Sequence, residues 1–232
     1  MNTMKQLGVG VISQSRLLWK VLLFLYLPIV LLFLAVGLLS RLLDDLTLSL
    51  LMRDIVTTGR LPFFTGLVPQ LEGVLWSASL TVCVIGWVVL KRRGGDVARS
   101  KRFLLQFSVV TAILLLDDIF LFHGEIAPKH LHIGKNIVLS IYLLTIGVFV
   151  YSNRLVIFSS EYLILMLALG LFGASVLLDL LPLQMFSFHR FVLQLRVFLE
   201  DGLKFAGIAT WLTYFARYTV QQIESTSRTH SH

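Results

Sequence analysis

The sequence predicts an all-α polytopic membrane protein, a bundle of six transmembrane helices that forms one integral membrane domain over residues 1–232. Of the 232 residues, 56% are hydrophobic and only 14% are charged, which differs from the balance of a soluble domain. The mean hydropathy is +0.84. The apolar residues gather in six runs, and most of these approach the length of about 20 residues that a helix needs to cross a bilayer.

The six runs define the expected spans in chain order. The first, residues 17–40, is too long for a secretory signal and no small-residue cleavage site follows it, so we interpret it as a retained span that Pro28 kinks. The others are residues 71–90, 103–123, 137–151, 162–181 and 193–214. Between the first two, residues 41–60 carry leucines on one side and acids on the other. This pattern is typical of an interfacial helix, and it would equally suit a helix that simply continues the first span.

Lysine and arginine in the short loops predict the orientation. The segment KRRGGDVARSKR, residues 91–102, holds most of the excess behind the net charge of +7, and positive loops stay cytoplasmic. We therefore expect a bacterial inner-membrane protein with both termini in the cytoplasm. Anionic lipid is the expected partner of this loop and a nucleic acid is not, while a homo-oligomer or a soluble cytoplasmic partner stays open. The single cysteine, Cys83, excludes an internal disulfide.

Acidic residues within the apolar runs are the strongest functional signal. An ionised acid in hydrocarbon costs about 2.5–3.5 kcal/mol on insertion scales, so such residues usually face the bundle interior and mark a site. Asp117 and Asp118 lie near the end of the third span, and Asp179 lies near the end of the fifth. Glu200 and Asp201 follow the start of the sixth. With a rise of about 1.5 Å per residue, these acids are expected at one level beneath the outer face.

The shared depth of these acids predicts an outward-opening site for a divalent metal ion. Oxygen and nitrogen donors suit such an ion, and the acids outnumber the one lysine at the same depth, Lys204. Helical phase places Asp118 and Glu125 on one face, while Glu200 is expected to pair with Lys204 four residues later. The candidate ligands are Asp118, His123, Asp201, Asp117, Glu200, Asp179 and Glu125, with His130, His132 and His189 in outer loops as further donors.

A structural interpretation of the same acids also stays open. Acids in a helical bundle can pair with Lys204, Arg190 or Arg196 and serve only to fix the packing of the helices. Small residues in the second, fifth and sixth runs favour close contacts between those helices. We expect these three helices to gather around the third.

Two segments together resemble motifs of uncharacterised bacterial multi-span membrane proteins. LLDDIFLFHGE resembles an acidic pair followed by His-Glu, and LEDGLKFAGI resembles an acidic pair in the last helix with a third acid and a glycine. By this resemblance, the third and sixth spans contribute to one site through the residues Asp117, Asp118, His123, Glu200, Asp201 and Gly207. The chain departs from the pattern at Gly124, which separates the histidine from Glu125, and at Lys204, where the pattern has an acid. A lysine there would convert a metal site into a self-contained network of ion pairs.

Three functions follow as hypotheses. The first is binding of a divalent cation for structure, for sensing or for lipid-directed hydrolysis, without an assigned catalytic residue. The second is a transporter or channel coupled to protons or cations, with the same acids as a relay. The third is a non-catalytic assembly or anchoring subunit whose basic loop docks a partner or anionic lipid.

Overall fold

The described part of the chain is helical throughout. The structure, a computed structural model, describes residues 27, 30, 31, 33–35, 37, 38, 41, 42, 59–62, 65–93, 98–180 and 190–229. The chain divides into two compact units, Met1–Thr65 and Gly66–His232. Of the first predicted span and of the predicted interfacial helix at residues 41–60, the structure describes only scattered residues. The second unit contains the acids discussed above.

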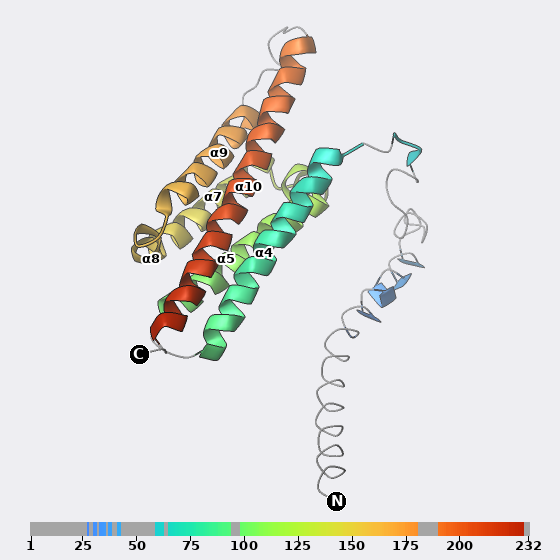
Figure 1. The fold of residues 1–232 in the computed structure, drawn as a ribbon. Coiled ribbons are helices and arrows are strands. Elements are labelled where there is room, and N and C mark those ends of the chain that lie inside the picture. Colours follow the sequence, from blue (N-terminus) through green and yellow to red (C-terminus); the bar gives the residue numbers. More distant parts are fainter. Residues whose placement is uncertain are drawn as a thin grey trace, which may run out of the picture. The chain divides into compact units, whose positions relative to one another are not determined.

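Five long helices form the frame of the second unit. They are α4 (Leu67–Arg93), α5 (Ala98–Phe120), α7 (Lys135–Ser152), α9 (Tyr162–Leu180) and α10 (Arg190–Thr229). Successive members run in opposite directions, and the C-terminal part of α10 lies beside the start of α5 (Figure 1), where Ser100 Oγ donates a hydrogen bond of 2.8 Å to Gln222 Oε1. Three short helices, η1 (Phe122–Ile126), α6 (Ala127–His130) and α8 (Arg154–Phe158), connect them.

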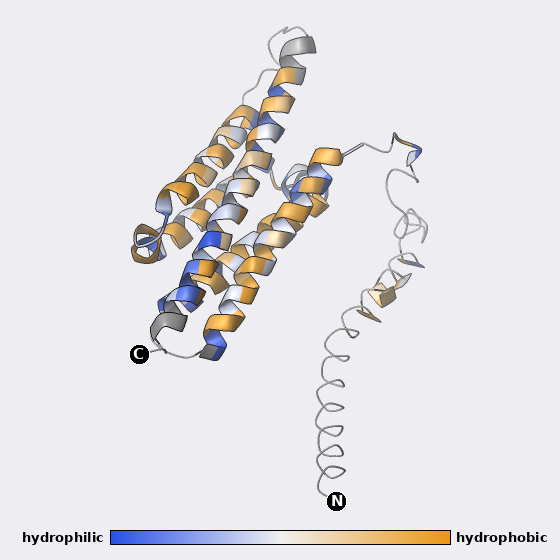
Figure 2. Ribbon diagram, viewed as in Figure 1, coloured by the Kyte–Doolittle hydropathy of each residue, from blue (hydrophilic) through white to orange (hydrophobic). Residues whose placement is uncertain are grey.

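Each of the last five predicted spans lies within or overlaps one of these helices. Among the described residues, α4, α5, α7 and α9 are long and apolar enough to cross a membrane. Most residues of α4 and α9 are hydrophobic, whereas the C-terminal part of α10 is more hydrophilic (Figure 2). The sixth predicted span, residues 193–214, forms part of α10, a continuous helix of 40 residues. α10 is long enough to cross a membrane, but it is less apolar than the other four helices and is not among these membrane-length helices.

The third predicted span ends earlier than its hydropathy indicates. α5 stops at Phe120 because Leu121 adopts a left-handed conformation with φ of 51°, and a π-helical turn follows. His123 therefore lies beyond the α-helix. The expected shared face of Asp118 and Glu125 is wrong for the same reason, since no single α-helix connects them. Glu125 instead pairs with Lys129 at an exposed position.

α10, and not the third span, is the central helix of the described bundle. It packs along both α9 and α4, and α4 also packs along α5. Its approach to α9 is close at Gly207, where an added Cβ would lie 2.8 Å from the Phe172 ring. At Gly86 of α4, an added Cβ would lie 2.7 Å from Cγ2 of Thr219. These two glycines are the close contacts, whereas an added Cβ at Gly73, Gly170 or Gly202 would meet nothing within 4 Å.

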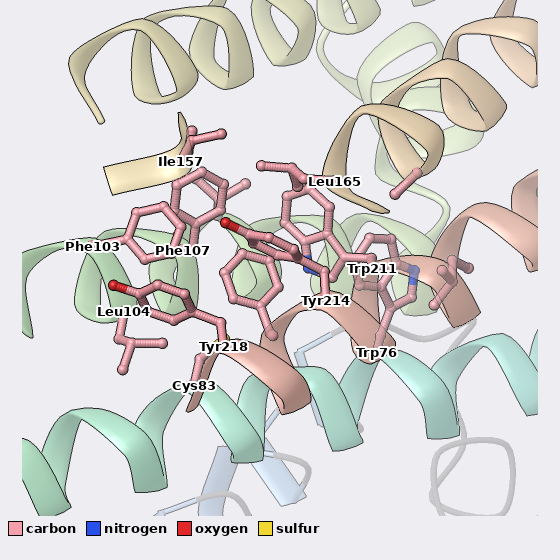
Figure 3. Close-up of a cluster of buried hydrophobic side chains, with 14 of the residues drawn as sticks. Trp76, Cys83, Phe103, Leu104, Phe107, Ile157, Leu165, Trp211, Tyr214 and Tyr218 are labelled. Atoms are coloured by element: carbon pink, nitrogen blue, oxygen red, sulfur yellow. The ribbon is translucent and has the colours of Figure 1, made fainter. Parts of the chain in front are cut away.

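A cluster of aromatic side chains joins α10 to its neighbours. Trp211 is fully buried, and its ring centroid lies 5.6 Å from that of Phe107 on α5 and 6.1 Å from that of Trp76 on α4. Figure 3 shows Trp211, Tyr214 and Tyr218 between side chains from α4, α5, α8 and α9. Trp211 Nε1 also donates a hydrogen bond of 3.2 Å to Thr111 Oγ1, which satisfies its buried donor. We call this group the aromatic cluster: Trp76, Phe103, Phe107, Phe172, Trp211, Tyr214, Phe215 and Tyr218.

Candidate functional site

Two carboxylates and one lysine form a buried charged centre among three helices. Lys204 of α10 donates to Glu72 Oε2 over 2.8 Å and also contacts Asp118 Oδ1. Glu72 comes from the second turn of α4, and Asp118 comes from the last turn of α5. The Glu72 residue is only 2% exposed, and the Asp118 side chain is 10% exposed. We call this group the Lys204 centre.

The charge of the Lys204 centre is not balanced. Two ionised carboxylates and one ammonium leave one negative charge, and a third acid, Asp201, lies close enough to repel Glu72. Glu72 Oε1 and Asp118 Oδ2 are buried and have no hydrogen-bond partner in the described part of the chain. Because uncompensated buried charge is costly, such a centre favours binding of a proton or another cation.

Asp117 faces a different set of partners from its neighbour Asp118. Asp117 Oδ1 accepts a hydrogen bond of 2.9 Å from the His123 backbone N–H and another of 2.9 Å from the Tyr142 hydroxyl. Asp117 Oδ2 lies 2.6 Å from His123 Nδ1. An ionised carboxylate only accepts hydrogen bonds, so this contact places the ring proton on Nδ1. The other ring nitrogen, Nε2, is then the basic one.

The chain path explains how His123 reaches Asp117 from six residues away. The left-handed Leu121 reverses the chain at the end of α5, and the π-helical turn brings the His123 backbone back to the helix end. The Asp117 carboxylate then caps this turn. A carboxylate that orients a histidine through Nδ1 leaves Nε2 available as a proton acceptor or a metal ligand. The His123 side chain is 24% exposed, so it is accessible.

Asp179 belongs to a third group of charges. Lys135 at the start of α7 donates to Asp179 Oδ1 over 2.7 Å, and an Arg196 nitrogen, Nη2, lies 3.6 Å from the same oxygen. Arg196 also donates to the main-chain carbonyls of Leu178 and Asp179, at 2.9 and 2.7 Å. It therefore closes the C-terminal end of α9, where backbone carbonyls lack helical partners. This group of charges connects α7, α9 and α10.

Glu200 pairs with a different cation from the one expected. Its Oε2 lies 3.7 Å from Nη2 of Arg196, one turn earlier, whereas Lys204 turns to α4 and α5. The i,i+4 rule applies to both pairs, but Lys204 reaches two buried carboxylates from other helices that stabilise it more strongly.

The predicted metal ligands are thus distributed over several groups. Asp118 lies in the Lys204 centre, Asp117 and His123 form a second group, and Asp179 and Glu200 form a third. Within the part of the chain that the structure describes, no three His, Cys, Asp or Glu residues are grouped so as to hold a metal ion. His189 lies outside that part. Divalent-metal binding stays a prediction.

Sequence reasoning brought the third and sixth spans together correctly but missed three partners. Asp118 and Lys204 do meet, as the structural interpretation of the acids allowed. Glu72 was overlooked, although an acid within the second apolar run is itself a signal. Tyr142 and Lys135 carried no such signal, because a tyrosine in a span and a lysine at a span end usually serve as interfacial anchors.

A further ion pair fixes the other end of α10. Arg217 Nη2 lies 2.5 Å from Glu161 Oε1, and Gln221 Nε2 donates to the same oxygen over 3.0 Å. Hydrogen bonding to Arg217 lowers the pKa of Glu161. Because Glu161 directly precedes α9, the pair joins the start of α9 to the C-terminal part of α10.

Fold and site together define an all-helical protein with four membrane-length helices and a buried charged layer near one end of the bundle. The chain belongs to the family described as a domain of unknown function (DUF8692), whose model matches residues 18–218. The match includes both acidic motifs. No curated protein and no solved structure matches the chain.

Proposed function

We propose that this protein is a multi-pass membrane protein in which the Lys204 centre binds and releases a proton during ion-coupled transport. The observation that carries the proposal is that two buried carboxylates share one ammonium while a third acid lies nearby. A proton gained or lost at such a centre changes its net charge in a medium of low dielectric. It can thereby be linked to helix movement or to a transported ion.

The Asp117–His123 pair supplies an accessible group next to this centre. Asp117 and Asp118 are adjacent, and each takes its partner from a different part of the structure. His123 is partly exposed, so it is suited to exchange protons with the outside, while the Lys204 centre is suited to hold one inside. This arrangement supports a relay, and we propose that His123 takes its first step.

Basic residues support an orientation for the proposal. Lys91 and Arg92 at the end of α4 lie near Arg99 and Lys101 at the start of α5, at the same end of the bundle as the C-terminus (Figure 1). On the positive-inside rule this end is cytoplasmic. The charged layer then lies toward the periplasmic face of a bacterial inner membrane, with the predicted span at residues 17–40 completing a set of six.

Proteoliposomes with a pH-sensitive dye inside test the proposal. An acid step applied outside should acidify vesicles that contain wild-type protein faster than empty vesicles. The variants E72Q and D118N should reduce that rate at least tenfold, because each removes one carboxylate of the Lys204 centre. The matched control is E125Q, which removes a carboxylate from an exposed ion pair. Equal rates in wild type, E72Q, D118N and empty vesicles would reject proton transport.

Divalent-metal binding is the second candidate, and the orientation of His123 by Asp117 favours it. Metal-bound histidines usually donate their other ring N–H to a carboxylate or a carbonyl. Elemental analysis of purified protein should then find one metal ion per chain, and H123Q and D118N should both lose it. Protein without stoichiometric metal after growth in metal-supplemented medium would reject this candidate. A third outcome would favour the anchoring hypothesis. In it, the acid-to-amide variants keep the cellular function of the protein, whereas neutralisation of Lys91 and Arg92 abolishes that function.

A further inference from the structure

An apolar groove with one carboxylate runs beside the Lys204 centre. It lies between the start of α4 and the N-terminal half of α10, and its volume is about 670 Å³, within the range of about 300–1,000 Å³ typical of ligand pockets. Asp201 and Gly202 line it together with five apolar side chains: Val68, Leu71, Val197, Phe198 and Phe205. Phe198 is 74% exposed, so the groove is open at this residue.

Among the described residues that line the groove, Asp201 is the only charged one. In the described part of the chain, no hydrogen bond or ion pair reaches its carboxylate. Its electrostatic neighbours Glu72 and Glu200 are both acidic. The two cations on the same helix are engaged elsewhere, since Lys204 binds Glu72 and Asp118, and Arg196 binds Asp179 and Glu200. The groove therefore combines apolar walls with local negative charge.

We propose that this groove binds an amphiphile with a cationic amine head group. The hydrocarbon tail would lie on the apolar side chains, and the head group would pair with the Asp201 carboxylate. Charge complementarity selects this class, because a sulfate or phosphate head group would meet Asp201 with Glu72 and Glu200 behind it. A metal ion fits less well, because it needs several ligands and the groove presents one.

This site stands apart from the proton proposal. Amphiphile binding at Asp201 requires no change of protonation at Glu72 or Asp118, so the two can be measured separately. A protein could bind the amine without proton flux, or show flux without binding it. Asp201 and the Lys204 centre lie side by side along α10, so the negative charge of the acids acts at both.

The test is calorimetric titration of the purified full-length protein in neutral maltoside micelles. Dodecyltrimethylammonium is the probe, and dodecyl sulfate is the matched probe of opposite charge. The proposal expects saturable binding of one dodecyltrimethylammonium per chain and no saturable binding of dodecyl sulfate. D201N should weaken the binding at least tenfold, because it removes the head-group charge. E161Q is the matched control and should change affinity less than threefold, since Glu161 pairs with Arg217 at the other end of α10 and does not line the groove.

A steric variant keeps the proposal testable if D201N does not fold. An added Cβ at Gly202 meets nothing within 4 Å, so G202W can extend into the groove while G202A leaves it open. G202W with an unchanged melting temperature should abolish binding, and G202A should retain it. Wild-type affinity in both D201N and G202W would overturn the proposal. So would equal binding of dodecyl sulfate, or a dimer that G202W dissociates, since the groove would then belong to a second copy.

Discussion

Trp211 of the aromatic cluster and Lys204 of the Lys204 centre lie two turns apart on α10, and they fix this helix through different interactions. Around Trp211, tilted and edge-on rings from α4, α5 and α9 fill the space between the helices, and the buried Trp211 donor has a partner. Around Lys204, an ion pair network joins α4, α5 and α10 but leaves two buried carboxylate oxygens unpartnered. Neutral packing specifies one arrangement, whereas the charged layer can exist in more than one protonation state.

Truncation of the aromatic cluster should have the largest effect on stability. W211A removes a fully buried ring that touches four neighbouring aromatic side chains, and it should cost about 4 kcal/mol of unfolding free energy in detergent. T111V is the control, because it keeps the Trp211 ring and its packing and removes the acceptor of the Trp211 hydrogen bond, for about 1–3 kcal/mol. Equal losses in the two variants would show that the hydrogen bond dominates the packing.

Removal of the lysine should have the next largest effect. K204M leaves Glu72 and Asp118 buried without their cation and should cost about 3 kcal/mol, because a broken buried pair leaves uncompensated charge. The triple variant E72L/D118L/K204M removes every charge of the centre and should recover most of that loss while it abolishes proton flux. Stability measured by chemical unfolding checks both. If K204M is as stable as wild type, the ion pairs of Lys204 do not stabilise the folded protein. The comparison with the aromatic cluster would then be wrong.

Obstruction of the close contact between α9 and α10 should have a smaller effect. G207A places a methyl group against the Phe172 ring, where its Cβ would lie 2.8 Å away, and it should cost about 1–2 kcal/mol. G173A is the matched control, because an added Cβ there meets nothing within 4 Å. Thermal unfolding of the two variants should therefore differ, and identical melting temperatures would contradict the helix contact at Gly207.

Changes at the histidine should alter function more than stability. H123Q removes the basic ring nitrogen while Asp117 keeps the backbone N–H of residue 123 and the Tyr142 hydroxyl as partners. We expect slower proton uptake with a melting temperature near that of wild type. Y142F, which removes one hydrogen bond to Asp117 and keeps the histidine, is the control and should retain uptake. Loss in Y142F equal to that in H123Q would assign the effect to Asp117 instead.

The smallest effect should follow pH at the other end of α10. The pKa of Glu161 is lowered by its hydrogen bonds to Arg217, so the pair stabilises the protein above the pKa of a free glutamate. That contribution is lost as the pH falls through the lowered pKa of the folded protein. Because Glu161 is well exposed to solvent, the change should be small. Melting curves of wild type and E161Q should converge at acidic pH, and a constant difference at every pH would contradict the ion pair.

The sequence predicted the helices better than the partners of the charged residues. Long apolar runs define helices through local hydropathy, so the second to fifth predicted spans match α4, α5, α7 and α9 to within about five residues, whereas α10 extends to Thr229, well beyond the sixth predicted span at residues 193–214. The sequence could place Asp118 and Lys204 at the same depth, because each lies at a known distance along its span from the outer end of that span. The choice between Glu200 and Glu72 as the Lys204 partner depends on helix rotation and on the parallel packing of α4 and α10, which no local pattern encodes. His123 could not be placed, because the left-handed Leu121 gives no signal in a leucine-rich run.

Infrared difference spectroscopy tests the central claim most directly, because it detects a protonated carboxylic acid inside the protein. In wild-type protein a pH step should produce a carboxylic-acid carbonyl band that disappears in E72Q or D118N and persists in E125Q. That result would place an exchangeable proton at the Lys204 centre. The same band in E72Q, D118N and wild type, or its absence from wild type at every pH between the limits of protein stability, would contradict the account.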